Sequence, residues 1–126
     1  MLKGIAASQG IAIAKVYKLV QPVLDIKQVE ADSDQELAKL DAAFTKTVAD
    51  IEKIKEVASK SLKAEELAIF DAHLMMINDP EYRNMIEDEI RNSKTNAEFA
   101  AQSVSNMMVG MFESMDDEYM RGRAAD

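Results

Sequence analysis

One long amphipathic pattern constrains the fold of this chain more than any other feature. Apolar residues recur at spacings of three and four between residues 37 and 58, which is the repeat of a helix with one buried face. Its members are Leu37, Leu40, Phe44, Val48, Ile51, Ile54 and Ala58. Ser33 and Glu36 have capping-box spacing just before this run. We therefore predict one helix of about 28 residues, whose apolar stripe requires other helices to pack against it.

The chain beyond residue 63 is also predicted to be helical. A second helix is expected over roughly Ala64–Ile77, followed by a third that Asp79 caps and Pro80 begins. Thr95, with Glu98 three residues later, has the form of another capping box. The paired acids Asp116 and Asp117 are expected to begin a final helix, after which no stop signal is recognised.

The first 32 residues have a different character. Residues 10–20 alternate with the period of two that is typical of a strand, and Leu2–Ala6 is a candidate for a short partner strand. One or two strands do not make a stable sheet in water, so this segment is expected to pair with something else. We predict a mainly α fold, an antiparallel helical bundle preceded by a short β stub. The expected domains are N-terminal strands at 1–20, a linker at 21–32 and a helical unit at 33–126 with a truncated last helix.

The negative charge is concentrated in the second half of the chain. Residues 1–63 carry ten basic and nine acidic groups, whereas residues 64–126 carry five basic and fourteen acidic groups, for a net charge of −8 overall. A negative field repels nucleic acid, so no nucleic-acid partner is expected. The same field attracts a basic protein and speeds its encounter, although acidity can also serve solubility alone.

Several classes of site lack the residues that they need. The sequence has no cysteine and a single histidine, His73, which excludes disulfides, thiolate metal sites and cysteine nucleophiles. Carboxylate-bridged metal bundles need a Glu three residues before the His, and Phe70 stands there. His73 is therefore interpreted as a structural residue, and no catalytic or metal-binding residue is expected. No membrane span or export signal is recognised, so we expect a cytoplasmic location and no membrane insertion.

The helix predicted at Ala64–Ile77 carries two different stripes. Leu67, Phe70, Leu74 and Ile77 form an apolar stripe suited to a core. The second stripe has small residues in its middle, adaptable methionines beside them and acids at its borders. It consists of Glu65, Ala68, Ala72, Met75, Met76 and Asp79. A helix buried on two sides would also explain small and methionine residues, but buried faces seldom carry so many carboxylates, which favours a partner-binding surface.

Three blocks of the sequence resemble one known family. They are Gly4–Lys15, then Ala68–Met75 followed by Asp79–Glu81, and finally Asp116–Met120 followed by Arg123–Asp126. In this order they are similar to the opening segment, the central helix pair and a later helix of enzyme I, the phosphoenolpyruvate–protein phosphotransferase of the bacterial sugar phosphotransferase system.

The resemblance implies a split architecture in which an all-helical subdomain is inserted into an α/β phosphohistidine subdomain. The β stub is then the first part of that incomplete α/β unit. The family's phosphorylated histidine lies in a Ser-His-Thr motif that this sequence lacks, and phosphoenolpyruvate and magnesium bind in a later barrel domain. The resemblance therefore implies a magnesium-dependent enzyme as a whole, of which this chain is an inactive, cofactor-free fragment. The remainder of that longer chain is an expected partner.

The resemblance also implies a partner for the helical unit, the histidine-containing phosphocarrier protein, which presents a basic rim and an apolar patch around its active histidine. The partner-binding residues that it implies are Glu65, Ala68, Asp71, Ala72, Met75, Met76, Asp79, Glu81 and Tyr82, with Phe112, Met120 and Arg123 as further contacts. The chain departs from the family pattern at Ala14, Ala64 and Glu66.

Two alternatives stay open at this point. The chain can instead be a non-enzymatic helical interaction or dimerisation module that associates through its methionine-rich faces, and an unpaired N-terminal strand would also favour a homodimer. Paralogues in which the same domains serve nitrogen regulation are not separated from the sugar-uptake branch by anything in this sequence.

Overall fold

The structure is a computed structural model that describes residues 5, 9–11, 13–20, 22–122 and 124. Within these residues it contains the helices α1 (Ser33–Ala58), α2 (Ala64–Ile77), α3 (Pro80–Ser93), α4 (Ala97–Glu113) and α5 (Glu118–Gly122). The prediction of a mainly α fold is confirmed, and the second helix has the bounds expected for it. None of the described helices is both long enough and apolar enough to cross a bilayer.

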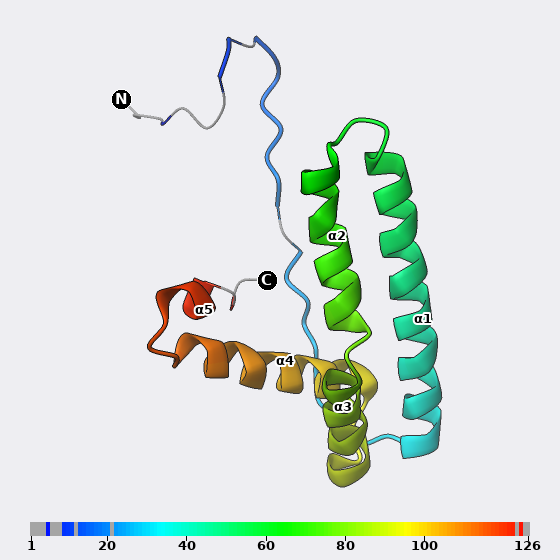
Figure 1. The fold of residues 1–126 in the computed structure, drawn as a ribbon. Helices are drawn as coiled ribbons and strands as arrows, with labels where there is room; N and C mark the ends of the chain where they lie inside the picture. Colours follow the sequence, from blue (N-terminus) through cyan, green and yellow to red (C-terminus); the bar gives the residue numbers. More distant parts are fainter. Residues whose placement is uncertain (1–4, 6–8, 12, 21, 123, 125–126) are drawn as a thin grey trace.

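The helices form two pairs that meet at one end of the molecule: α1 and α2 are antiparallel, whereas α4 runs across the direction of α3 (Figure 1). The long α1 lies beside α2, and the two are joined by a short turn at residues 59–63. The second pair, α3 and α4, packs against the first half of α1, and α4 then extends away from α2 toward the short α5 (Figure 1). Among the described helices, α2 contacts α1 and α3 but not α4 or α5.

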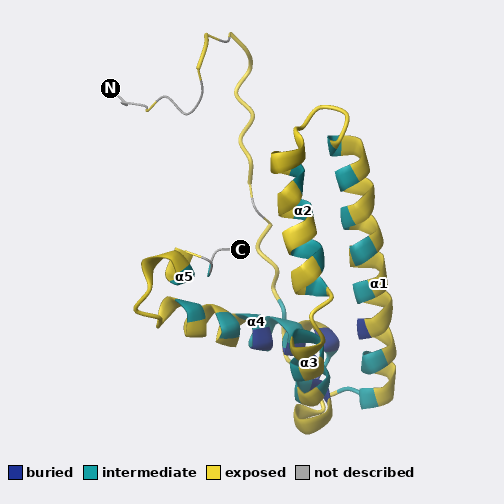
Figure 2. Ribbon diagram, viewed as in Figure 1, coloured by how far each residue is buried: buried dark blue, intermediate teal, exposed yellow. Residues whose placement is uncertain are grey.

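The core lies where α1, α3 and α4 meet. Its buried apolar side chains cluster at this junction, as the dark blue segments of Figure 2 show. They are Leu40 of α1, Ile86 and Ile90 of α3, and Ala97, Ala100 and Val104 of α4. Ile86 and Ile90 are 0 % exposed. Burying such a side chain contributes about 1.5–3 kcal/mol to the stability of the folded state.

Two helix starts differ by one residue from their predicted capping boxes. The N-cap of α1 is Asp32 rather than Ser33, because the Asp32 carboxylate accepts a hydrogen bond from the backbone of Gln35 at 3.0 Å. The N-cap of α4 is Asn96 rather than Thr95, since Thr95 is fully buried and bridges backbone to Glu30. In each case an equally good capping residue stands next to the expected one.

Glu36 has a different role from the one that its spacing indicated. Its Oε2 accepts a hydrogen bond from the backbone amide of Ala97, the first residue of α4, at 2.8 Å. The side chain of Asn96 makes no cap bond to its own helix, and its Oδ1 accepts from the Val29 backbone instead. The carboxylate of α1 thus takes up one of the free amides at the start of α4, where negative charge is also favourable.

The other two predicted starts agree with the structure. Asp79 caps α3 by accepting from the Glu81 backbone at 2.8 Å, and Pro80 occupies the first turn. Asp117 accepts from the Met120 backbone at 2.9 Å at the start of α5.

The strand expected at residues 10–20 does not form in the part of that segment that the structure describes. Residues 13–20 lie exposed without strand pairing, and Ile13 is 100 % exposed. A strand needs a hydrogen-bonding neighbour, and the helices offer none. Most of the partner strand expected at 2–6 lies outside the described residues. The division into units at 1–20, 21–32 and 33–126 stays a prediction.

Candidate functional site

The most distinctive surface of the molecule is the side of α2 that faces away from α1. Leu67, Phe70, Leu74 and Ile77 are half-buried, so α2 turns its apolar stripe inward. Helical spacing then places Glu65, Ala68, Ala72 and Met75 on the opposite side, and all four are exposed, Met75 by 76 %. We call these four residues, together with Met76, the outer α2 face; Met76 is 51 % exposed. The yellow outer side of α2 in Figure 2 has no helix over it.

One apolar residue beside this face was not included by sequence reasoning. Ile69 is 54 % exposed and lies two helical turns from Met76, on the same side of α2. The signal that could have found it is the i, i+7 spacing of two large apolar residues outside the core stripe. Ile69 extends the exposed apolar surface toward the flank of α2 that lies away from Asp71.

The acidic residues predicted to border the outer α2 face differ in whether their carboxylates have partners within the described chain. Glu65 and Glu81 are exposed, and no hydrogen bond or ion pair of their side chains is found within the described residues. Asp79 is exposed, but its carboxylate serves as the N-cap of α3. Asp71 forms an ion pair with Lys55 of α1, so its charge is already partly compensated within the chain.

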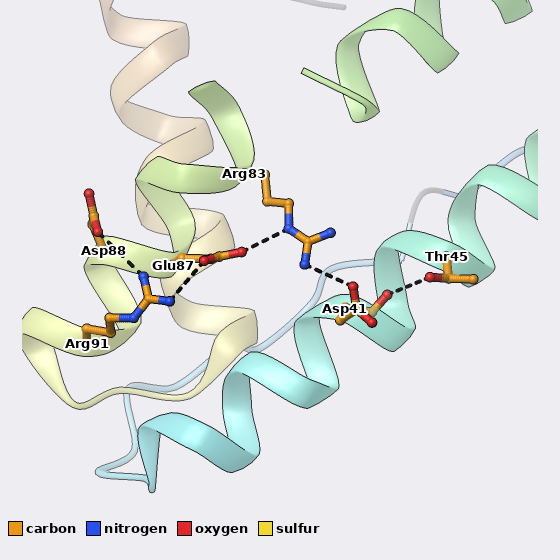
Figure 3. Close-up of polar contacts among 6 residues, drawn as sticks. All are labelled: Asp41, Thr45, Arg83, Glu87, Asp88 and Arg91. Carbon is orange, nitrogen blue, oxygen red and sulfur yellow. Dashed lines mark hydrogen bonds and ion pairs between the residues drawn. The ribbon is translucent and has the colours of Figure 1, made fainter. Parts of the chain in front are cut away.

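The first turn of α3 follows this face directly and is anchored by Arg83. The guanidinium donates from Nε to Glu87 and from Nη2 to Asp41 of α1, each at 2.9 Å (Figure 3). It also lies 5.7 Å from the centre of the Phe44 ring. Hydrogen bonding to Arg83 lowers the pKa of the Glu87 carboxyl, and Arg91 adds to this effect. The network fixes α3 against α1, and through it the corner between α2 and α3.

Tyr82 is more enclosed than the other predicted contacts on α2 and α3. It is half-buried, its hydroxyl lies 2.9 Å from the Ser105 hydroxyl of α4, and its ring centre lies 6.2 Å from that of Phe44. Tyr82 therefore connects α1, α3 and α4, and only its remaining surface is available to a partner.

The remaining predicted contacts lie apart from the outer α2 face. Phe112 of α4 and Met120 of α5 are both half-buried, and their helices do not contact α2 within the described part of the chain. Arg123 lies outside the described residues. The structure thus brings together the predicted residues of α2 and α3, and leaves those of α4 and α5 on a second arm (Figure 1).

His73 is half-buried on α2, and no hydrogen bond to it is found among the described residues. The described residues contain no group of three or more His, Cys, Asp or Glu side chains that could hold a metal ion. On the outer α2 face, exposed apolar residues lie beside exposed carboxylates.

Comparison with known proteins places the chain in a family. The family model described as the N-terminal part of PEP-utilising enzymes matches residues 3–123. The phosphoenolpyruvate-protein phosphotransferase of Listeria monocytogenes is 52 % identical over 126 residues, covering 99 % of this chain and 22 % of that protein. The protein of the same name from Bacillus subtilis is 48 % identical, with the same shares covered. The chain spans about a fifth of the length of these relatives.

Solved structures agree with this result. A solution NMR structure of an Enzyme I protein is 34 % identical and superposes with a TM-score of 0.75, covering 82 % of this chain and 43 % of that one. The N-terminal domain of a nitrogen Enzyme 1 has a TM-score of 0.72 over 81 % of this chain, and at 22 % identity it supports the fold alone. The chain belongs to the family of PEP-utilising enzymes and corresponds to their N-terminal part.

Proposed function

We propose that this chain is the part of an enzyme I that docks the histidine-containing phosphocarrier protein. The observation that carries the proposal is the exposure of Ala68, Ala72 and Met75 on a side of α2 that no described helix covers. Small residues let another backbone approach closely, and methionine adapts to the shape of a partner. Phosphoenolpyruvate and magnesium would act in other parts of the longer protein, so this chain contributes recognition and no bond-making step.

The proposed binding has a long-range and a short-range part. The carboxylates of Glu65 and Glu81 steer a partner with a basic rim, since opposite charges raise the rate of encounter. At short range the outer α2 face supplies apolar contact, which is the part of an interface that contributes most to its stability. The carrier's histidine would thereby be held near the phosphohistidine of the complete protein.

A charge placed in the middle of the outer α2 face tests the proposal. We expect Met75→Asp to weaken binding of the carrier by about 1–3 kcal/mol, or about five- to 150-fold, because an aspartate would be desolvated in the contact. Isothermal titration of the chain with histidine-containing phosphocarrier protein measures this change. Val57→Asp is the matched control, because Val57 is 60 % exposed on α1 and lies outside the proposed contact.

Equal affinity for wild type and Met75→Asp would contradict docking at this face. The charge variants Glu65→Gln and Glu81→Gln are expected mainly to slow association and to flatten its dependence on salt, with a smaller effect on dissociation.

The alternative function is self-association through methionine-rich surfaces. Met107 and Met111 of α4, which are 47 % and 55 % exposed, would form part of such a surface. Sedimentation with and without the carrier separates the two, because self-association would give a dimer in the absence of any carrier.

A further inference from the structure

The ion pair between Lys55 and Asp71 connects α1 to α2 at the border of the proposed docking surface. Lys55 lies in the last turn of α1, and its ammonium group binds Oδ1 of Asp71 on α2. The side chains are 33 % and 55 % exposed, respectively. The pair is thus accessible to a molecule that approaches α2, and it is the only ion pair found between α1 and α2 within the described residues.

Asp71 occupies a position where its charge would matter to a partner. It lies one residue before Ala72 and one helical turn before Met75, on the flank of the outer α2 face that adjoins α1. A basic rim laid over Met75 would come close to this carboxylate. It would also come close to the ammonium group of Lys55, which repels it.

We propose that Lys55 is a specificity-determining residue that restrains docking by occupying Asp71. This inference rests on the proposed function. A cationic side chain of the partner must either share Asp71 with Lys55 or displace it, and exposed ion pairs are weak enough to be displaced. Lys55 therefore lowers the affinity for any basic protein and reserves tight binding for a partner that also satisfies the apolar contact at Met75.

Removing the charge of Lys55 tests this role. Lys55→Met keeps most of the side-chain length that packs between the helices and leaves Asp71 uncompensated. We expect it to bind histidine-containing phosphocarrier protein about three- to tenfold more tightly at low salt, mainly through faster association. The difference should shrink at about 0.5 M salt, where the screening length falls below the reach of the interaction.

Two further variants separate this role from a general change of charge or structure. Lys46→Met removes the same charge from α1, where Lys46 pairs with Asp50 and is 77 % exposed, and it should change the affinity less than twofold. Lys55→Met combined with Asp71→Asn should return the affinity to about the wild-type value, because the local charge is again balanced. A purely structural role of Lys55 would not be rescued in this way, since the double variant still lacks the ion pair.

The outcomes distinguish the two proposals. A gain in Lys55→Met that disappears in the double variant supports the role of Lys55. Unchanged or weaker binding by Lys55→Met, with Met75→Asp still disruptive, overturns the role of Lys55 and leaves docking in place. Absence of any binding by the wild-type chain overturns both. Thermal melts of each variant report whether loss of the pair has loosened the α1–α2 contact.

Discussion

The junction of α1 with α3 and α4 and the hairpin of α1 with α2 differ sharply in how much they bury. The junction of α3 and α4 with the first half of α1 contains every buried apolar residue found among the described residues. The helix α2 contains none, although its amino acids are apolar on average. Its inward stripe is only half-buried, because α1 covers it from one side and no described helix covers it from the other.

Polar contacts follow the same division. At the junction, Glu36 binds the α4 backbone, Arg83 binds Asp41, and Lys39 binds Glu98 at 2.6 Å. The hairpin of α1 and α2 is crossed by the Lys55–Asp71 pair. Segments with few buried contacts open at lower free energy than the core. A well-packed junction thus supports an arm whose outer side stays exposed.

The strongest test of this comparison is a cavity placed in each part. We expect Ile90→Ala, at the junction, to lower the free energy of unfolding by about 2–5 kcal/mol, because Ile90 is 0 % exposed and its removal leaves a space that neighbours fill only in part. The matched change Leu67→Ala in the half-buried stripe of α2 should cost less than half as much. Urea denaturation of both variants measures the difference. Equal losses would mean that the arm is as well packed as the junction.

A smaller effect is expected from the contact that joins α1 to the start of α4. Glu36→Ala should lower the free energy of unfolding by about 1–3 kcal/mol, because it leaves the Ala97 amide without its acceptor in a partly buried position. Glu56→Ala is the control, since Glu56 is an exposed residue of the same helix whose side chain has no such bond in the described structure. Guanidinium denaturation compares the two. A loss in Glu36→Ala no greater than in the control would show that the contact contributes little.

Sequence reasoning found the helices of this molecule well because their signals are local. The bounds of α2 follow from its apolar spacing and from Asp79 and Pro80, which stop one helix and begin the next. The caps of α1 and α4 were wrong by one residue, since Asp32 and Asn96 compete with the neighbours that were chosen. Local signals do not rank two adjacent capping residues.

The features missed by sequence reasoning depend on contacts between helices. Glu36 and Ala97 are 61 positions apart, and no pattern in the sequence indicates that they meet. The same holds for Lys55 and Asp71, which are 16 positions apart across a turn. The apolar stripe of α2 that begins at Leu67 was expected to lie in a bundle core. It is only half-buried, because α4 leaves the junction in a direction away from α2. The outer α2 face stood out in the sequence because it combines small residues, methionines and acids on a single helix.

The smallest expected effect concerns pH, and it again belongs to the junction. The pKa of Glu87 is lowered in the folded chain by hydrogen bonds from Arg83 and Arg91, and that of Glu98 is lowered by Lys39. A carboxyl whose pKa is lower in the folded state stabilises the folded state above the unfolded pKa of 4.5, and this contribution is lost as the pH falls through the pKa of the folded state.

We therefore expect the free energy of unfolding to decline below about pH 4.5. Glu87→Gln should remove part of that decline, at a cost of less than about 1 kcal/mol at pH 7. Urea midpoints between pH 7 and pH 3 measure both effects. Glu56→Gln is the control, because Glu56 is an exposed residue of α1. If Glu87→Gln and wild type lost stability in parallel as the pH fell, the Arg83 network would not be a source of the acid sensitivity, and the Lys39–Glu98 pair would be the remaining source at the junction.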